Sequence, residues 1–83
     1  MYYTTPHNKT VAAIGAMTTA MKAQRALQAE GIFAEIVALS PKQTRRGCAY
    51  GIEFYAQDER TVRMALAAVR ITPSQFINKG STL

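Results

Sequence analysis

The only cysteine of this 83-residue chain, Cys48, follows a basic segment in the stretch SPKQTRRGCAYGIEF. Thiolate is the nucleophilic form of cysteine, and nearby cations lower the pKa of a thiol from its ordinary value of about 8.5 by stabilising the anion. Lys42, Arg45 and Arg46 precede Cys48 closely in the sequence and are expected to have this effect. The pattern predicts a reactive thiol, while a buried cysteine that packs as a small apolar side chain is the alternative. The residues alone leave both interpretations open.

The segment before Cys48 is predicted to be a loop between two strands. Pro41 supplies no N–H to a sheet ladder and ends the preceding apolar run, residues 32–40. Gly47 stands at the other end of the polar stretch and, with Pro41, is expected to shape the loop. Residues 49–55 then alternate, which places Tyr50, Ile52 and Phe54 on one face of a strand and Gly51, Glu53 and Tyr55 on the other. The two strands are expected to form a hairpin.

Two amphipathic helices are predicted, one before and one after this hairpin in the sequence. The first spans residues 18–31, with Thr18 or Thr19 as its N-cap, Gly31 at its end, and a core-facing stripe of Ala16, Ala20, Ala23 and Leu27. The second begins at Asp58 as N-cap and buries Val62, Ala65, Leu66 and Val69. Its opposite face carries three cations that form a possible anion-binding set, Arg60, Arg63 and Arg70.

A short apolar strand over residues 10–16 precedes the first helix, and a last short strand is expected around residues 75–78. The order strand, helix, strand, strand, helix, strand predicts an α+β, ferredoxin-like two-layer sandwich, βαββα(β), with both helices on one face of a mainly antiparallel sheet. We expect one domain over residues 1–83, with an N-terminal arm at 1–9 and a flexible tail at 79–83.

Composition limits the function classes. The content of 48% hydrophobic and 18% charged residues is that of a globular chain, and neither a membrane-spanning run nor a secretory signal is visible, so we expect a cytoplasmic protein without a membrane partner. A single cysteine excludes an internal disulfide, a CxxC dithiol and a cysteine-rich zinc site, and no metal is expected. The net charge of +5 favours anionic partners.

The segments TTAMKAQRALQAEGI and ALSPKQTRRGCAYGIEF, in this order, resemble the selenium/sulfur carrier-like small domains over roughly residues 11–55. Pro41, Lys42, Gly47 and Cys48 stand at the matching places, whereas Ala49 stands where that family usually has a second glycine. The resemblance implies a non-enzymatic carrier that holds sulfur or selenium on Cys48 as a persulfide or selenosulfide, without another cofactor. It also implies donor and acceptor proteins as partners, with the loop cations in electrostatic support.

Two alternatives come from other residues. A basic module for nucleic acid or acidic proteins would use the arginine set with stacking aromatics, Tyr2, Tyr3, Tyr50, Phe54 and Tyr55, although Tyr50 and Phe54 are better explained as core. A regulatory or assembly protein, with a homo-oligomer as one form, would use Met17, Met21 and Met64. His7 is the only histidine, and Asp58 with Glu59 suits a helix start, so acid/base catalysis is not expected.

Overall fold

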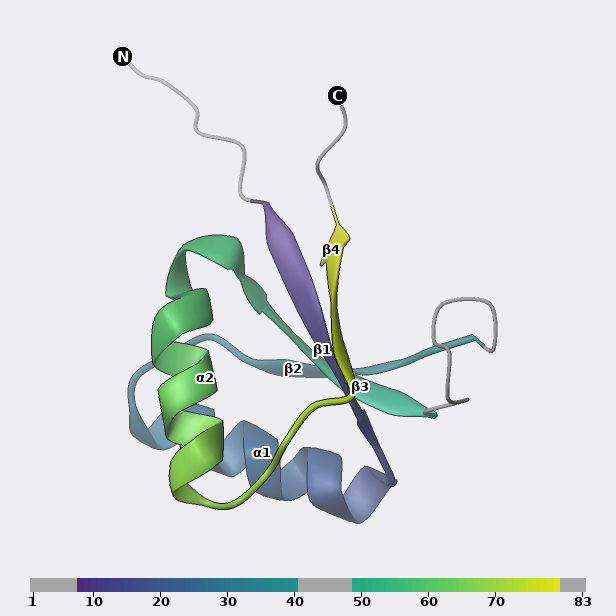
Figure 1. Cartoon of the computed structure of the whole chain (residues 1–83), viewed down its shortest axis with the longest axis horizontal. Coiled ribbons are helices and arrows are strands. Elements are labelled where there is room, and N and C mark those ends of the chain that lie inside the picture. The colour runs from purple at the N-terminus through teal and green to yellow at the C-terminus, as the bar shows by residue number, and fades with distance from the viewer. Residues whose placement is uncertain (1–7, 41–48, 80–83) are drawn as a thin grey trace.

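The computed structural model describes residues 8–40 and 49–79 as a four-stranded antiparallel sheet with two helices (Figure 1). The strands run in the order β2-β3-β1-β4, which is the ferredoxin-like arrangement expected from the sequence. The elements follow one another as β1 (Lys9–Gly15), α1 (Met17–Ala29), β2 (Glu35–Ala38), β3 (Tyr50–Tyr55), the short 3-10 helix η2 (Ala56–Asp58), α2 (Glu59–Ala68) and β4 (Gln75–Lys79).

Both helices pack on the same face of the sheet. In the buried cluster, three residues of α1 and two of α2 meet three residues of the central strands: Ala20, Ala23, Leu27, Val62, Leu66, Ala12, Ile52 and Phe54, all fully buried. The alanines of α1 let this helix approach the sheet closely, because they carry no side chain beyond Cβ. The predicted inward faces of both helices are confirmed, except that Ala16 lies outside α1 and is exposed.

The two helices end in the same way. At the end of α1, Ile32 N–H donates to Leu27 O at 3.0 Å and Gly31 N–H donates to Gln28 O at 2.9 Å. Gly31 has φ +75°, so the pair of bonds is a Schellman motif with glycine in its left-handed position. The bonds that the N–H groups of Ile71 and Arg70 donate to Leu66 and Ala67 repeat this motif at the end of α2.

Two boundaries differ from the sequence prediction. The predicted threonine cap is wrong, since α1 begins at Met17 with Ala16 as N-cap and no side-chain cap bond. Gly15, at φ +127°, turns the chain at once from β1 into the helix, before Thr18 is reached. Strand β2 is shorter than predicted because Ile32 is still part of the helix-ending motif, and strand geometry begins only at Glu35.

The strand registers bring distant residues together at two ends of the sheet. At one end, Gly15 of β1 pairs with Tyr50 of β3, and Ser74 N–H donates to Ala13 O at 3.0 Å. We call this the hairpin end, because β2 also finishes there, at Ala38. At the other end lie the turn between α1 and β2 and the beginning of α2 (Figure 1). We call this the α1–β2 end.

Candidate functional site

The hairpin of β2 and β3 holds the two ends of the segment that carries the predicted thiol. Ala38 pairs with Tyr50 in the antiparallel register, and beyond them Leu39 N–H donates to Ala49 O at 2.8 Å. The predicted hairpin is therefore confirmed. Residues 41–48 lie outside the described residues, and with them the predicted site set of Pro41, Lys42, Arg45, Arg46, Gly47 and Cys48.

The residues that flank this segment lie close to the start of α1. Tyr50 pairs with Gly15, which is followed by the N-cap Ala16 and then by the helix. Figure 1 shows the start of β3 and the start of α1 on the same side of the molecule. The first turn of α1 contains no acidic residue and receives no side-chain cap. Its N–H groups and the helix dipole therefore give the hairpin end a positive potential that favours anions.

The predicted arginine set does not form one row on α2. Arg60 and Arg63 lie in the helix and are exposed, but Arg70 follows the helix end in the left-handed conformation, with φ 61°. Arg63 is engaged within the protein: its Nε and Nη2 donate to Glu59 Oε2 at 2.9 and 2.7 Å, and its guanidinium carbon lies 3.9 Å from the ring centre of Phe76. An anion at Arg63 would have to compete with the Glu59 carboxylate.

The aromatic residues of β3 divide between the two faces of the sheet, as the alternation predicted. Phe54 is fully buried against the helices, and Tyr50 packs against the same core. Tyr55 lies on the other face, where its ring centre is 5.0 Å from that of Phe33. Tyr2 and Tyr3 lie outside the described residues. The described part of β3 thus offers a single aromatic side chain, Tyr55, on the face away from the helices.

A cluster of charged and aromatic groups at the α1–β2 end was not predicted. Lys9 Nζ lies 5.5 and 5.7 Å from the ring centres of Phe33 and Tyr55, and 3.9 Å from Glu53 Oε1. Glu35 stands directly opposite Glu53 in the β2–β3 register. The available sequence signal was Phe33, a large aromatic residue two positions after the helix-ending Gly31, but its neighbours come from three strands.

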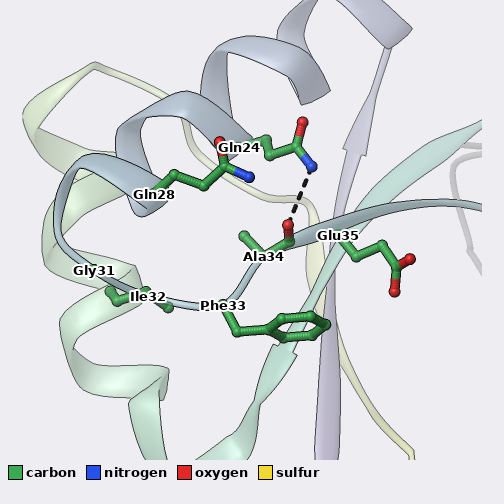
Figure 2. A pocket seen from close by; sticks show the side chains of 7 residues that line it. All are labelled: Gln24, Gln28, Gly31, Ile32, Phe33, Ala34 and Glu35. Carbon is green, nitrogen blue, oxygen red and sulfur yellow. Dashed lines mark hydrogen bonds between the residues drawn. The ribbon is translucent and has the colours of Figure 1, made fainter.

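A pocket of about 480 Å³ adjoins this cluster, between the end of α1 and the chain that leads into β2 (Figure 2). Gln24 Nε2 donates to Ala34 O at 3.1 Å and thereby ties α1 to this chain. The lining is Gln24, Gln28, Gly31, Ile32, Phe33, Ala34 and Glu35.

The described residues contain neither a cluster of metal ligands nor a membrane-spanning helix. In residues 8–40 and 49–79, no group of three or more His, Cys, Asp or Glu side chains is placed to hold a metal ion. Neither helix of this part of the chain has the length and apolar character needed to cross a membrane.

The fold and the hairpin define a small ferredoxin-like α+β domain with a basic connecting segment between β2 and β3. The family model described as "Putative Se/S carrier protein-like" matches residues 9–78, and the chain belongs to this family. The match confirms the family that the resemblance over residues 11–55 suggested, and it extends through α2 into β4. Neither the curated proteins nor the solved structures gave a match.

Proposed function

We propose that this protein carries a sulfur or selenium atom on Cys48 and passes it from a donor protein to an acceptor protein. The observation that carries the proposal is the family match over residues 9–78, which includes the hairpin segment with the only cysteine of the chain. The protein would act as a carrier and not as a turnover enzyme, because it returns to its starting thiol only after a partner has accepted the atom.

The chemistry needs one thiol and no added oxidant. The Cys48 thiolate attacks the outer sulfur of a donor persulfide, R–S–SH. A new S–S bond forms on Cys48, the donor S–S bond breaks, and the donor leaves as the thiolate R–S⁻. An acceptor thiolate then attacks the outer sulfur of Cys48–S–SH, which regenerates the Cys48 thiolate. With selenium, the outer atom is Se in each step.

The position of the hairpin supports this chemistry. A carrier atom must reach two different proteins, so the thiol should be near an accessible connection and not in the core. Ala49, which follows Cys48 in the sequence, is exposed, and its carbonyl oxygen accepts a hydrogen bond from Leu39 N–H. The uncapped start of α1 lies at the same end of the sheet and favours negative charge there.

The composition of the segment supports partners with acidic surfaces. Lys42, Arg45 and Arg46 would stabilise the anionic sulfur and would attract such proteins by long-range charge. Pro41 and Gly47 would shape the connection between the strands.

Intact-mass measurement tests the proposal directly. Incubation with glutathione persulfide should add about 32 Da to the native chain, and a selenium donor should add about 79 Da. A second incubation with an excess of acceptor thiol should restore the original mass. The Cys48→Ser variant is the control and should gain nothing. An unchanged mass of the wild-type chain, while a free peptide thiol in the same tube acquires the atom, would refute the carrier function.

A further inference from the structure

The pocket at the end of α1 has walls of mixed chemistry. Figure 2 shows Gln24 and Gln28 extending from α1 on one side of the Ala34 backbone, with Phe33 and Glu35 extending from the chain that enters β2. The Phe33 side chain is exposed, with 42% of its surface accessible. The lining therefore offers an aromatic ring and a carboxylate on one side of this chain and two side-chain amides on the other.

The electrostatic character of this pocket is opposite to that of the protein as a whole. The C-terminal end of a helix carries a negative partial charge, and the last turn of α1 contains no basic residue to offset it. Within residues 8–40 and 49–79, neither Glu30 nor Glu35 forms an ion pair. Lys9 lies nearby, but it is 3.9 Å from Glu53, whose carboxylate offsets its charge. The pocket therefore favours a cation although the chain has a net charge of +5.

The protein itself shows which cation fits such a set of groups. Where α2 contacts β4, the guanidinium carbon of Arg63 lies 3.9 Å from the ring centre of Phe76, and Arg63 donates two hydrogen bonds to Glu59. Phe33 and Glu35 bring the same two residue types together in the pocket. Lys9 Nζ lies 5.5 Å from the Phe33 ring centre, and no arginine of residues 8–40 and 49–79 contacts this ring. A guanidinium stacks flat on an aromatic ring and donates to a carboxylate with its remaining edge.

We propose that this pocket binds an arginine side chain that a basic segment of a partner protein presents. The guanidinium would stack on Phe33 and donate to the Glu35 carboxylate, which extend on the same side of the chain that enters β2. Such a site involves neither Cys48 nor the hairpin end. It would give the protein a second contact surface, selective for basic partners, at the end of the sheet opposite the hairpin end.

An NMR titration of the full chain tests the inference with a single functional group. Acetyl-arginine amide should cause saturable shift changes in the backbone amides of residues 31–35 and in the side-chain amides of Gln24 and Gln28. Acetyl-citrulline amide is the matched control, because it keeps the shape of arginine but has no charge. A peptide with two arginines separated by glycine should bind at least threefold more tightly than the single amide. Equal response to arginine and citrulline, or no gain with the peptide, would contradict the proposal.

Variants separate binding from folding. Glu35→Gln should weaken the arginine amide at least fivefold, and Phe33→Leu should weaken it about threefold. Because Glu35 faces Glu53 across the strands, Glu35→Gln removes a like-charge pair and should leave the fold intact. Glu59→Gln makes the same chemical change at the Arg63 pair and should leave the titration unchanged. Unaltered affinity in Glu35→Gln would overturn the site, whereas Cys48→Ser should bind as the wild type does, whatever the outcome for the carrier function.

Discussion

Arg70 occupies, at the end of α2, the same backbone position that Gly31 occupies at the end of α1. Both residues have positive φ, 61° for Arg70 and 75° for Gly31, and each is followed by an isoleucine whose N–H donates to a leucine of its own helix. The two segments, ALQAEGI and ALAAVRI, carry the leucine and the isoleucine at equal spacing. The arginine therefore adopts a conformation for which glycine is suited.

Replacing Arg70 with glycine should stabilise the protein. A left-handed conformation costs a non-glycine residue about 1 to 2 kcal/mol, and the greater freedom of glycine in the unfolded chain takes back about half of this. We expect a net gain of about 0.5 to 1 kcal/mol in the free energy of unfolding, measured by urea denaturation. Arg70→Ala is the matched control, because it removes the side chain but keeps the backbone cost. Equal stabilities of the glycine and alanine variants would contradict this explanation.

Gly51 should not tolerate a side chain. A Cβ at this position would lie 2.7 Å from the backbone oxygen of Ala12 and 2.8 Å from Val11 Cγ1, on the neighbouring central strand. Gly51→Ala should lower the free energy of unfolding by about 1 to 3 kcal/mol, as overpacking does. Combining it with Val11→Ala removes one of the two clashes, so the double variant should lose less stability than the sum of the single variants. Simple additivity of the two changes would argue against a direct contact.

The contact of Arg63 with Phe76 should be worth more than its ion pair with Glu59 at high salt. Both side chains of the pair are partly exposed, so their coupling should be a few tenths of a kcal/mol and should vanish in 1 M NaCl. Stacking on the ring should contribute about 0.5 to 1 kcal/mol and persist in salt. Double-mutant cycles of Arg63→Ala with Glu59→Ala and with Phe76→Leu measure the two couplings. Equal salt dependence of both cycles would show that the ring contributes no specific attraction.

On the proposed carrier function, Lys42, Arg45 and Arg46 should increase the reactivity of Cys48. Replacing Lys42, Arg45 and Arg46 with glutamine should slow alkylation by iodoacetamide at pH 7 about tenfold, because less of the thiol would be in the anionic form. Replacing Arg60, Arg63 and Arg70 with glutamine removes the same charge elsewhere and is the control. Alkylation rates followed by mass spectrometry provide the measurement. Equal slowing in both triple variants would mean that only the overall charge matters.

The pattern of apolar residues predicted most of the fold. Alternation in residues 50–55 assigned Ile52 and Phe54 to the core face of β3, and the spacing of Val62 and Leu66 assigned the buried face of α2. These predictions succeed because each depends on the period of one element, 2.0 for a strand and 3.6 for a helix. The family was also evident from the order of two short segments.

The residues that begin and end each helix were predicted less well, because several neighbouring residues can take the same capping position. Thr18 is a good cap residue, yet Gly15 ends β1 early enough for the helix to start at Met17. Nothing in the residue type of Arg70 signals a left-handed conformation, which the packing of Leu66 and Ile71 in the core imposes.

The sequence by itself determined the order of the elements, their inward faces and the family, since these follow from periodicity and from short segments that are continuous in the chain. Only the tertiary structure decided which distant groups meet. The pairing of Glu35 with Glu53, the position of Lys9 beside Phe33 and Tyr55, and the contact of Arg63 with Phe76 each join separate elements. Strand register and helix packing set these contacts. Both are determined by the burial of the apolar face of the sheet against the two helices, to which all elements contribute together.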